Sequence, residues 1–217
     1  MVASAAMGCE VIAHPLVRAK VGVLRERGTG MELFRRTLRE LGTILGYEAL
    51  RDVGEVEAKI KTPMMDCEAK RLAKEVVIMP ILRAGLGMAD AVAEVVPDAK
   101  IGHIGMYRDE TTLEPKSYFL RVPSGSEGST VLVIDPMLAT GNSAVDALDQ
   151  LKREGCKDLR LVCVIGAPEG VKRVNGAHPE VPIFLAALDD GLDERGYILP
   201  GLGDAGDRYF GTGGVGV

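Results

Sequence analysis

Residues 131–143 have the sequence Val-Leu-Val-Ile-Asp-Pro-Met-Leu-Ala-Thr-Gly-Asn-Ser, and this stretch decides the fold. Its first four residues are apolar and mostly β-branched, which predicts a short buried strand at Val131–Ile134. A carboxylate follows, then a turn of small and polar residues, then a helical pattern over Ser143–Glu154 with Gly155 placed to end it. Amide groups in such a turn and in a first helical turn have no partners within the helix. The stretch therefore predicts an anion-binding loop.

Asp135 narrows the kind of anion that such a loop would bind. A carboxylate repels a lone phosphate, so its place directly before the loop is unfavourable if phosphate is the whole ligand. A sugar phosphate removes the conflict, because its hydroxyl groups can donate to Asp135 while the phosphate lies on the amides. The alternative is an ordinary turn between a strand and a helix, with Asp135 at the surface.

Composition limits the classes of protein that this chain can be. At 217 residues, 47% of them hydrophobic, it fits one domain with a substantial core. A formal net charge of −5 argues against a nucleic-acid partner, since phosphate backbones select basic surfaces. We find no apolar run of membrane-spanning length and no secretory signal pattern, so we expect no membrane partner and a soluble, cytoplasmic protein. Four scattered cysteines, Cys9, Cys67, Cys156 and Cys163, are expected to be buried thiols in a reducing compartment.

Helical and strand patterns alternate along the chain. An amphipathic helix is expected over Met31–Ala49, and a shorter helix from about Met88 to Pro97 and another near Glu169–Asn175. Further strands are expected at Val76–Ile81, Ile101–Tyr107, Tyr118–Arg121, Leu159–Ile165 and Ile183–Leu188. This alternation predicts an α/β fold, a mainly parallel twisted sheet flanked by helices. Ligands bind such sheets at the carboxyl ends of the strands, and Asp135, Arg83 and Arg108 all follow predicted strands.

Two further loops carry arginines. Residues 80–88, Pro-Ile-Leu-Arg-Ala-Gly-Leu-Gly-Met, combine Arg83 with two glycines that permit close approach to a ligand. Residues 105–115 form a charged segment that places Arg108 where it could close over a reacting phosphate. Each loop has a plainer interpretation: many turns contain a glycine pair, and a charged loop is often only solvated surface.

The C-terminal segment Gly196–Thr212 is rich in glycine. We expect little regular structure in it, and backbone N–H and C=O groups turned toward a flat heterocycle. The alternative is an irregular wrap around the fold. His14, His103 and His178 form no catalytic set with a serine or cysteine, and each is expected to be structural.

Four motifs together, VLVIDPMLATGNS, MPILRAGLGM, GMYRDETTLEP and GYILPGLGDAGDRYFGT, closely resemble the uracil phosphoribosyltransferases. The resemblance extends from His14 to Thr212. It implies a single phosphoribosyltransferase domain over residues 1–217 with the type I phosphoribosyltransferase fold and a small C-terminal hood over the base site. Within that domain we expect an N-terminal arm at residues 1–30, the uracil-binding hood at 189–212 and a frayed tail at 213–217.

The resemblance also implies a reaction and roles for residues. The family transfers phosphoribosyl from 5-phospho-α-D-ribose 1-diphosphate (PRPP) to uracil, giving UMP and diphosphate in pyrimidine salvage, with Mg²⁺ carried by PRPP and no direct protein ligand for the metal. The implied catalytic residues are Arg108 and Asp204. The implied PRPP-binding residues are Arg83, Arg108, Asp135, Pro136, Met137, Leu138, Ala139, Thr140, Gly141, Asn142, Ser143 and Asp204. The implied uracil-binding residues are Ile198, Gly203, Asp204 and Ala205.

The chain departs from the family pattern at two places. Asn142 stands where the family usually has a second glycine, and Asn is the other residue that best tolerates a left-handed backbone, so we expect the turn to survive. The chain also continues past the usual Phe-Gly-Thr ending. The family further implies a homodimer or homotetramer and, in some members, activation by GTP. The rivals are a phosphoribosyltransferase-like pyrimidine regulatory protein and a phosphoribosyltransferase for another base.

Overall fold

Nine strands form one sheet within residues 8–108 and 115–212, the part of the chain that the computed structural model describes, apart from the side chains of Arg108, Pro115 and Lys116. The order is β1-β11-β10-β8-β4-β6-β7, with β5 beside β4 and β9 beside β10. The strands are β1 (Glu10–Val11), β4 (Val76–Leu82), β5 (Lys100–Ile101), β6 (His103–Arg108), β7 (Pro115–Arg121), β8 (Thr130–Ile134), β9 (Met137–Leu138), β10 (Asp158–Gly166) and β11 (Ile183–Leu188). Only β6 and β7 pair antiparallel among these described strands, which confirms the expected mainly parallel sheet.

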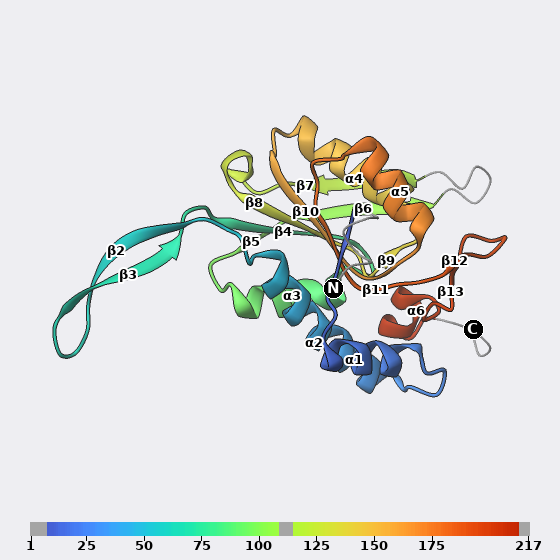
Figure 1. Cartoon of the computed structure of the whole chain (residues 1–217). Helices are drawn as coiled ribbons and strands as arrows, with labels where there is room; N and C mark the ends of the chain where they lie inside the picture. The colour runs from blue at the N-terminus through green and yellow to red at the C-terminus, as the bar shows by residue number, and fades with distance from the viewer. Residues whose placement is uncertain (1–7, 109–114, 213–217) are drawn as a thin grey trace.

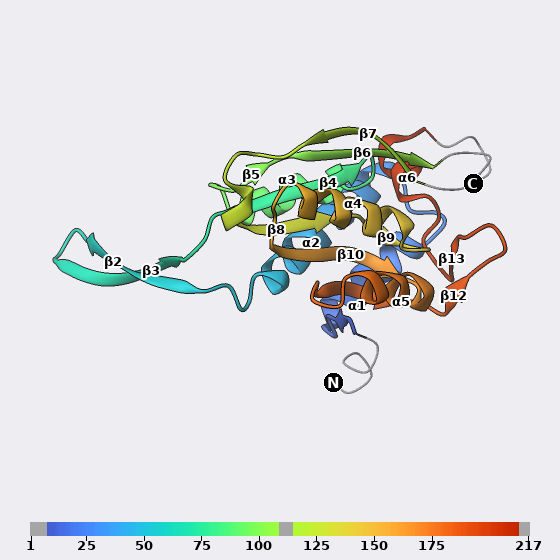
Figure 2. The same cartoon turned by 90° about the horizontal axis from the view of Figure 1, so that it is seen from above.

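Helices cover both faces of the sheet (Figure 1, Figure 2). On one face lie α1 (Pro15–Arg25), α2 (Met31–Ala49) and α3 (Leu86–Val95), and on the other lie α4 (Asn142–Arg153) and α5 (Pro168–Ala177). Strand β8 is apolar on both sides: Leu132 and Ile134 belong to the first core, Val131 and Val133 to the second. A parallel strand covered on two faces needs this continuous apolar run, which is why periodicity of two is absent from it.

Helix α2 has the bounds that its sequence predicts. Phe34, Leu38, Leu41 and Leu45 are all fully buried, so the expected apolar stripe faces the core. Gly42 lies against α3, where an added Cβ would come within 3.1 Å of the Met88 backbone. The small residue lets the two helices approach closely and fixes α3, whose N-terminus follows the Arg83 loop.

Two sequence predictions about element boundaries need correction. The strand expected over Ile101–Tyr107 is broken at Gly102, because that residue donates to the Ile78 carbonyl and packs where a Cβ would lie 2.3 Å from the Arg121 oxygen. Residues 1–30, expected as an arm, contain helix α1 among the described residues 8–30. His14 accepts a hydrogen bond from Leu16 N–H and Pro15 opens the helix, while Val17, Val21 and Leu24 are buried.

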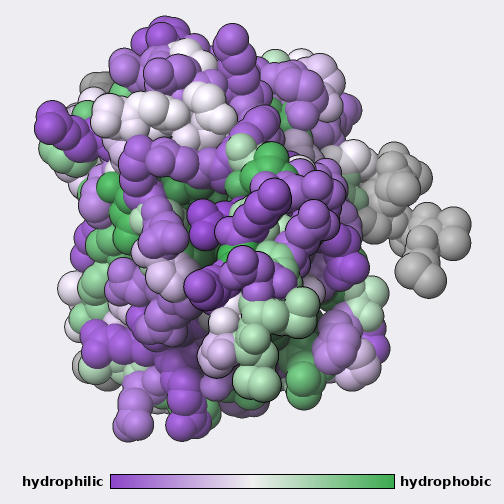
Figure 3. Space-filling view, turned by 90° about the vertical axis from the view of Figure 1, so that its left-hand side faces the viewer, coloured by the Kyte–Doolittle hydropathy of each residue, from purple (hydrophilic) through white to green (hydrophobic). Residues whose placement is uncertain are grey.

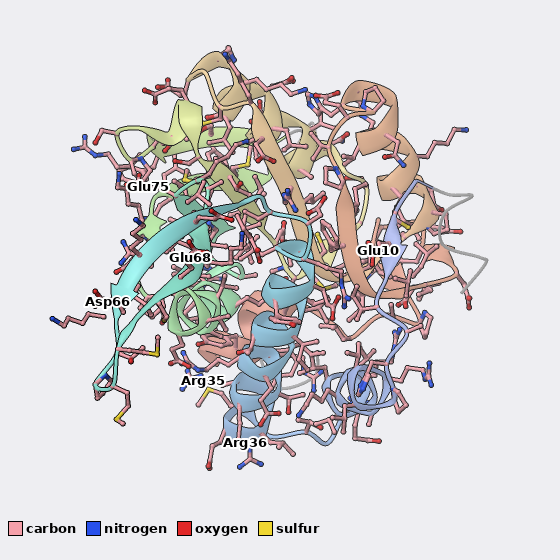
Figure 4. All side chains as sticks on the ribbon, turned by 60° about the vertical axis from the view of Figure 1, so that its left-hand side comes forward. Glu10, Arg35, Arg36, Asp66, Glu68 and Glu75 are labelled. Atoms are coloured by element: carbon pink, nitrogen blue, oxygen red, sulfur yellow. The ribbon has the colours of Figure 1, made fainter. Side chains whose placement is uncertain are left out.

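A long hairpin, β2 (Glu55–Lys61) with β3 (Asp66–Leu72), projects away from the sheet and was not predicted (Figure 2). In β2 the apolar residues Val56, Ala58 and Ile60 alternate with charged ones, so one face of the hairpin is mostly apolar and the other is charged. This alternation is a strand signal in the sequence, although nearly every position of the hairpin is exposed. Asp66 lies toward the tip of the hairpin and Glu75 near its base (Figure 4). The face of the molecule from which the hairpin projects is mostly hydrophilic, with apolar patches between the hydrophilic residues (Figure 3). Cys67 lies on this hairpin and is only partly buried, which corrects the expectation that every cysteine is buried.

The order of strands reverses between β4 and β8. The chain adds β6 on one side of β4, then crosses to add β8, β10 and β11 on the other. The loops that follow β4 and β8 therefore diverge at one point of the carboxyl edge and leave a crevice between them. No helix among the described residues has the length and apolar character needed to cross a membrane.

Candidate active site

A cavity of about 490 Å³ lies at this reversal point. Its floor comes from the ends of β4 and β6 and from the loop after β8, and its cover comes from residues 196–198 and 203–206. Cavities of this size accommodate ligands such as nucleotides. Segments from four separate parts of the chain thus meet around one space, as the resemblance implied for a ribose phosphate beside a base.

Asp135 lies at the floor of the cavity with a strongly perturbed acidity. Its pKa is raised from 3.8 to about 7: burial is the main cause, a hydrogen bond from Met137 N–H (3.2 Å) lowers the pKa, and the nearby Asp204 carboxylate adds a smaller rise. Asp135 N–H in turn donates to the Val162 carbonyl at 3.2 Å. The carboxylate is therefore fixed in direction and poorly solvated. Hydroxyl donors in the cavity would offset that lack of solvation.

The loop after Asp135 is shaped by residues that turn away from the cavity. The Pro136 carbonyl accepts from Val164 and Ile165 N–H, and Leu138 of β9 pairs with Gly166 of β10. Helix α5 closes on the loop at Gly170, where a Cβ would lie 2.4 Å from the Ala139 oxygen. The loop is consequently held from behind by the sheet and by α5, with its other side free to face a ligand.

Gly141, and not Asn142, provides the left-handed residue of this turn. Gly141 has φ of +82° and precedes α4, whose first residue is Asn142. The expectation that Asn142 must tolerate a left-handed backbone is therefore wrong, because the position needs only helical angles. Asn142 N–H points back to the Thr140 hydroxyl at 3.5 Å, and Ser143 reaches the cavity wall. The positive end of α4 thus faces the cavity, which favours a negative ligand.

Arg83 follows β4 directly and lies half-exposed at the cavity wall. Its guanidinium is 3.3 Å from Asp207 and 3.4 Å from the Thr212 hydroxyl, and it stands over the Phe210 ring at 5.7 Å. Gly85 makes the tight turn that brings Arg83 there, since a Cβ would lie 2.4 Å from the Ile134 oxygen. Arg83 is therefore a cation held at the edge of the cavity by exposed contacts that a ligand can replace.

The C-terminal segment contains more regular structure than the glycine content predicts. Strand β13 (Ile198–Leu199) pairs antiparallel with β12 (Gly191–Leu192), and α6 spans Ala205–Phe210. The short helix forms because the Asp204 carboxylate caps it, accepting from Asp207 N–H at 2.8 Å. Asp204 therefore uses one oxygen to cap α6 while lining the cavity, so its carboxylate has a fixed direction.

The structure brings most of the predicted site residues to one cavity. Its lining contains Arg83, Asp135, Met137, Ala139, Ser143 and Asp204 from the predicted PRPP set, and Ile198, Gly203, Asp204 and Ala205 from the predicted uracil set. Pro136, Leu138, Thr140, Gly141 and Asn142 shape the loop without lining the cavity. Arg108 is the last residue of β6, not the first of a loop. Its side chain and residues 109–114 lie outside the described part.

Three side chains at the site were not predicted. Tyr107 and Tyr197 line the cavity from opposite segments, and Asp207 pairs with Arg83. Asp207 had a signal in the sequence, because it belongs to the same Gly-Asp-Ala-Gly-Asp motif as Asp204 and lies one helical turn beyond it. The tyrosines had none, since a single aromatic next to a motif does not reveal which way it points.

Comparisons with known proteins agree with this geometry. The family model described as uracil phosphoribosyltransferase matches residues 11–212. A uracil phosphoribosyltransferase of Acholeplasma laidlawii is 52% identical over 93% of this chain and 97% of its own length. One of Streptococcus pneumoniae is 51% identical over 94% of this chain and 98% of its own.

Solved structures give the same answer for the fold. A protein of Aquifex aeolicus superposes with a TM-score of 0.90 at 41% identity, covering 93% of this chain and 97% of that one. An adenine phosphoribosyltransferase of Trypanosoma brucei superposes with a TM-score of 0.56 at 12% identity, which supports the fold alone. The chain has the type I phosphoribosyltransferase fold, and it belongs to the uracil phosphoribosyltransferase family.

Proposed function

We propose that this protein transfers the phosphoribosyl group of PRPP to uracil, producing UMP and diphosphate. One observation carries the proposal: a single cavity is lined on one side by Asp135 and the N-terminal end of α4, and on the other by the backbone of residues 203–206. The first side suits a ribose phosphate, and the second suits a flat base. Membership of the family supports the same reaction.

The protein's task in this reaction is electrostatic. Displacing diphosphate from the anomeric carbon leaves positive charge on the sugar and negative charge on the leaving group. We assign the diphosphate to Arg83, which lines the cavity wall, and to Arg108, the last residue of β6. Asp135 accepts from the ribose hydroxyls, and the 5′-phosphate lies on the loop that ends at Ser143. Asp204 faces both substrates, where it orients uracil.

Mg²⁺ fits this site as a companion of PRPP. Asp135 and Asp204 face the same cavity and repel each other, and a cation brought in with PRPP would relieve that repulsion. Within residues 8–108 and 115–212, no three His, Cys, Asp or Glu side chains gather as a metal cage. When bound, Mg²⁺ neutralises diphosphate charge.

Selection of the base follows from hydrogen-bond complementarity. Uracil has a donor at N3 between two carbonyls, while cytosine presents an acceptor at N3 and a donor at C4. Backbone groups of the Gly203–Ala205 turn that match uracil would be left unpaired against cytosine, which can reject an analogue by roughly 10⁴-fold. Association into a homodimer or homotetramer, activation by GTP and a cytoplasmic location stay predictions from the sequence.

The test is product formation from defined substrates. The full chain is mixed with Mg²⁺, PRPP and uracil, and UMP is measured by chromatography, with cytosine and hypoxanthine in parallel. We expect UMP from uracil alone, abolished in Asp135→Ala. We also expect Arg108→Ala to lower kcat far more than it weakens uracil binding. Absence of product from every base, or comparable rates with cytosine, would contradict the proposal.

A further inference from the structure

The loop Gly201–Asp204, which carries part of the base site, is a partition between two hollows. Gly203 and Asp204 line the main cavity on one side and a second hollow of about 290 Å³ on the other. Leu202 is buried in the core, whereas Gly203 is exposed and Asp204 is half-buried, so close packing holds only the first part of the loop. The position of the Gly203–Asp204 end therefore depends also on the polar contacts that the loop makes.

Those contacts come from an ion pair that neither lines the main cavity nor belongs to the family motifs. Arg25, the last residue of α1, binds the Asp189 carboxylate with both terminal nitrogens, one of them at 2.7 Å. The same guanidinium nitrogen donates to the Gly201 carbonyl at 2.8 Å. Asp189 accepts from Gly201 N–H at 2.9 Å. The pair thus grips both the N–H and the carbonyl of one residue at the start of the loop.

Burial makes this grip strong. The Asp189 side chain is 1% exposed and that of Arg25 is 25% exposed, so neither charge is well solvated if its partner is lost. Asp189 is itself fixed, because its N–H donates to the Gly166 carbonyl at the end of β10. Gly201 has φ of +65°, and a Cβ there would lie 2.1 Å from the Ile198 oxygen. The start of the loop therefore packs directly against the backbone of β13, the strand that faces uracil.

A second arginine reinforces the same arrangement. Arg208, on α6, donates to the Leu202 carbonyl at 2.7 Å and to the Leu24 and Glu26 carbonyls at the end of α1. Figure 1 shows α6 beside α1. The C-terminal end of α1 is therefore the platform on which the base loop rests, although α1 contributes nothing to the lining of the main cavity.

We propose that Arg25 and Asp189 are positioning residues for the uracil site, acting through Gly201 on the loop that ends at Asp204. The inference rests on the proposed function. Because the pair holds the base loop and touches neither Asp135 nor the loop after it, its loss should affect uracil far more than PRPP.

The experiment compares Michaelis constants for the two substrates in Arg25→Gln, Asp189→Asn and the double variant. We expect the uracil KM to rise by about 10-fold to 100-fold in each single variant, the order that a small displacement of a positioning group produces. The PRPP KM should rise at least about 5-fold less than the uracil KM, because Asp204 is only one of the groups assigned to PRPP and these variants leave the loop after Asp135 intact. The double variant should resemble the single variants, because the two residues act as one unit.

Arg160→Gln is the matched control. Arg160 is also a buried arginine that binds a carboxylate, Asp52, and a backbone carbonyl, that of Ala49, but it lies at the start of β10, opposite the cavity. We expect this variant to lose thermal stability without changing the ratio of the two KM values. If Arg25→Gln and Arg160→Gln change that ratio alike, the pair is merely structural and the proposal is wrong.

Two other failures can be told apart from a failure of this inference: misfolding of a variant and failure of the proposed function. If circular dichroism shows that Arg25→Gln is unfolded, Arg25→Lys keeps a charge opposite Asp189 and should show the same split more weakly; equal effects on both KM values would overturn the proposal. If the parent protein makes no UMP, the proposed function is wrong. If the parent makes UMP and the variants keep its uracil KM, only the present inference is wrong.

Discussion

Replacing Asp135 with Asn is expected to make the unliganded protein more stable at neutral pH while sharply lowering its activity. The change keeps the side chain's shape and leaves an oxygen that can accept from Met137 N–H. It removes a charge that burial disfavours and that the Asp204 carboxylate repels. The charged form of Asp135 therefore lowers the stability of the unliganded fold, while the same charge serves substrate binding.

The size and sign of the gain follow from the pKa of Asp135, which burial and Asp204 raise from 3.8 to about 7. Between these values the unfolded chain has lost the proton that the folded chain keeps, so the parent loses stability as the pH rises from about 4 to 7 and levels off above. At about 1.4 kcal/mol per pKa unit, the penalty approaches ~4 kcal/mol at pH 8 and ~2 kcal/mol at pH 5. The figures are upper limits, because water in the cavity solvates part of the carboxylate.

Urea unfolding at pH 5, 6, 7 and 8 measures the predicted difference. The free energy of unfolding of Asp135→Asn should exceed that of the parent by an amount that grows with pH and levels off near pH 8. Asp66→Asn, on the exposed hairpin (Figure 4), controls for the loss of one carboxylate. A difference that stays constant from pH 5 to 8, or a variant less stable than the parent at pH 8, would refute the reasoning.

Three further outcomes are expected. The kcat/KM for PRPP should fall as the pH drops below about 7, because Asp135 becomes protonated there. In pH–rate profiles this fall at low pH should be reduced or lost in Asp135→Asn. A fall that persists in the variant would come from the ionisation of PRPP itself. Gly85→Ala should cost about 1–3 kcal/mol in urea unfolding because its Cβ meets backbone oxygens, whereas Gly22→Ala, in open space on α1, should gain up to about 1 kcal/mol. Arg83→Ala should raise the PRPP KM about 10-fold or more, yet change unfolding by less than about 1 kcal/mol, since its partner contacts are exposed; a stability loss without a kinetic effect would oppose its assignment.

Local signals account for the parts of the fold that the sequence predicted. Helix α2 was placed because its apolar residues recur at helical spacing, and strand β8 because it is a short, unbroken run of apolar, mostly β-branched residues. Helix α1 carried the same kind of signal in Val17, Val21 and Leu24, with Pro15 at its first turn, and could have been found. The β2–β3 hairpin carried a signal too, because Val56, Ala58 and Ile60 alternate with charged residues, but the sequence does not show that both of its faces are exposed.

Some features of the candidate site could likewise be predicted from the sequence and others could not. Asp135 stands in a motif whose local chemistry points to a ligand, and Asp204 was implied by the resemblance, so both could be chosen before their shared cavity was known. Their mutual repulsion could not be predicted, because it depends on the distance between segments far apart in sequence. The same limit hid the pairing of Arg83 with Asp207, although both residues lie in motifs.

The base side of the site therefore depends on the N-terminal helix in a way that no motif shows. The phosphate side is built on β8, α4 and the turn at Gly170, whose mutual packing leaves no room even for a Cβ. On the base side Leu202 packs in the core, but Gly203 and Asp204 have hollows on both faces, and the loop is tied through Arg25 and Arg208 to residues 24–26. Packing tolerates little displacement, whereas a few polar ties set a position that each tie can shift. Variation at the end of α1 should consequently adjust binding of the base while binding of the sugar phosphate stays constant.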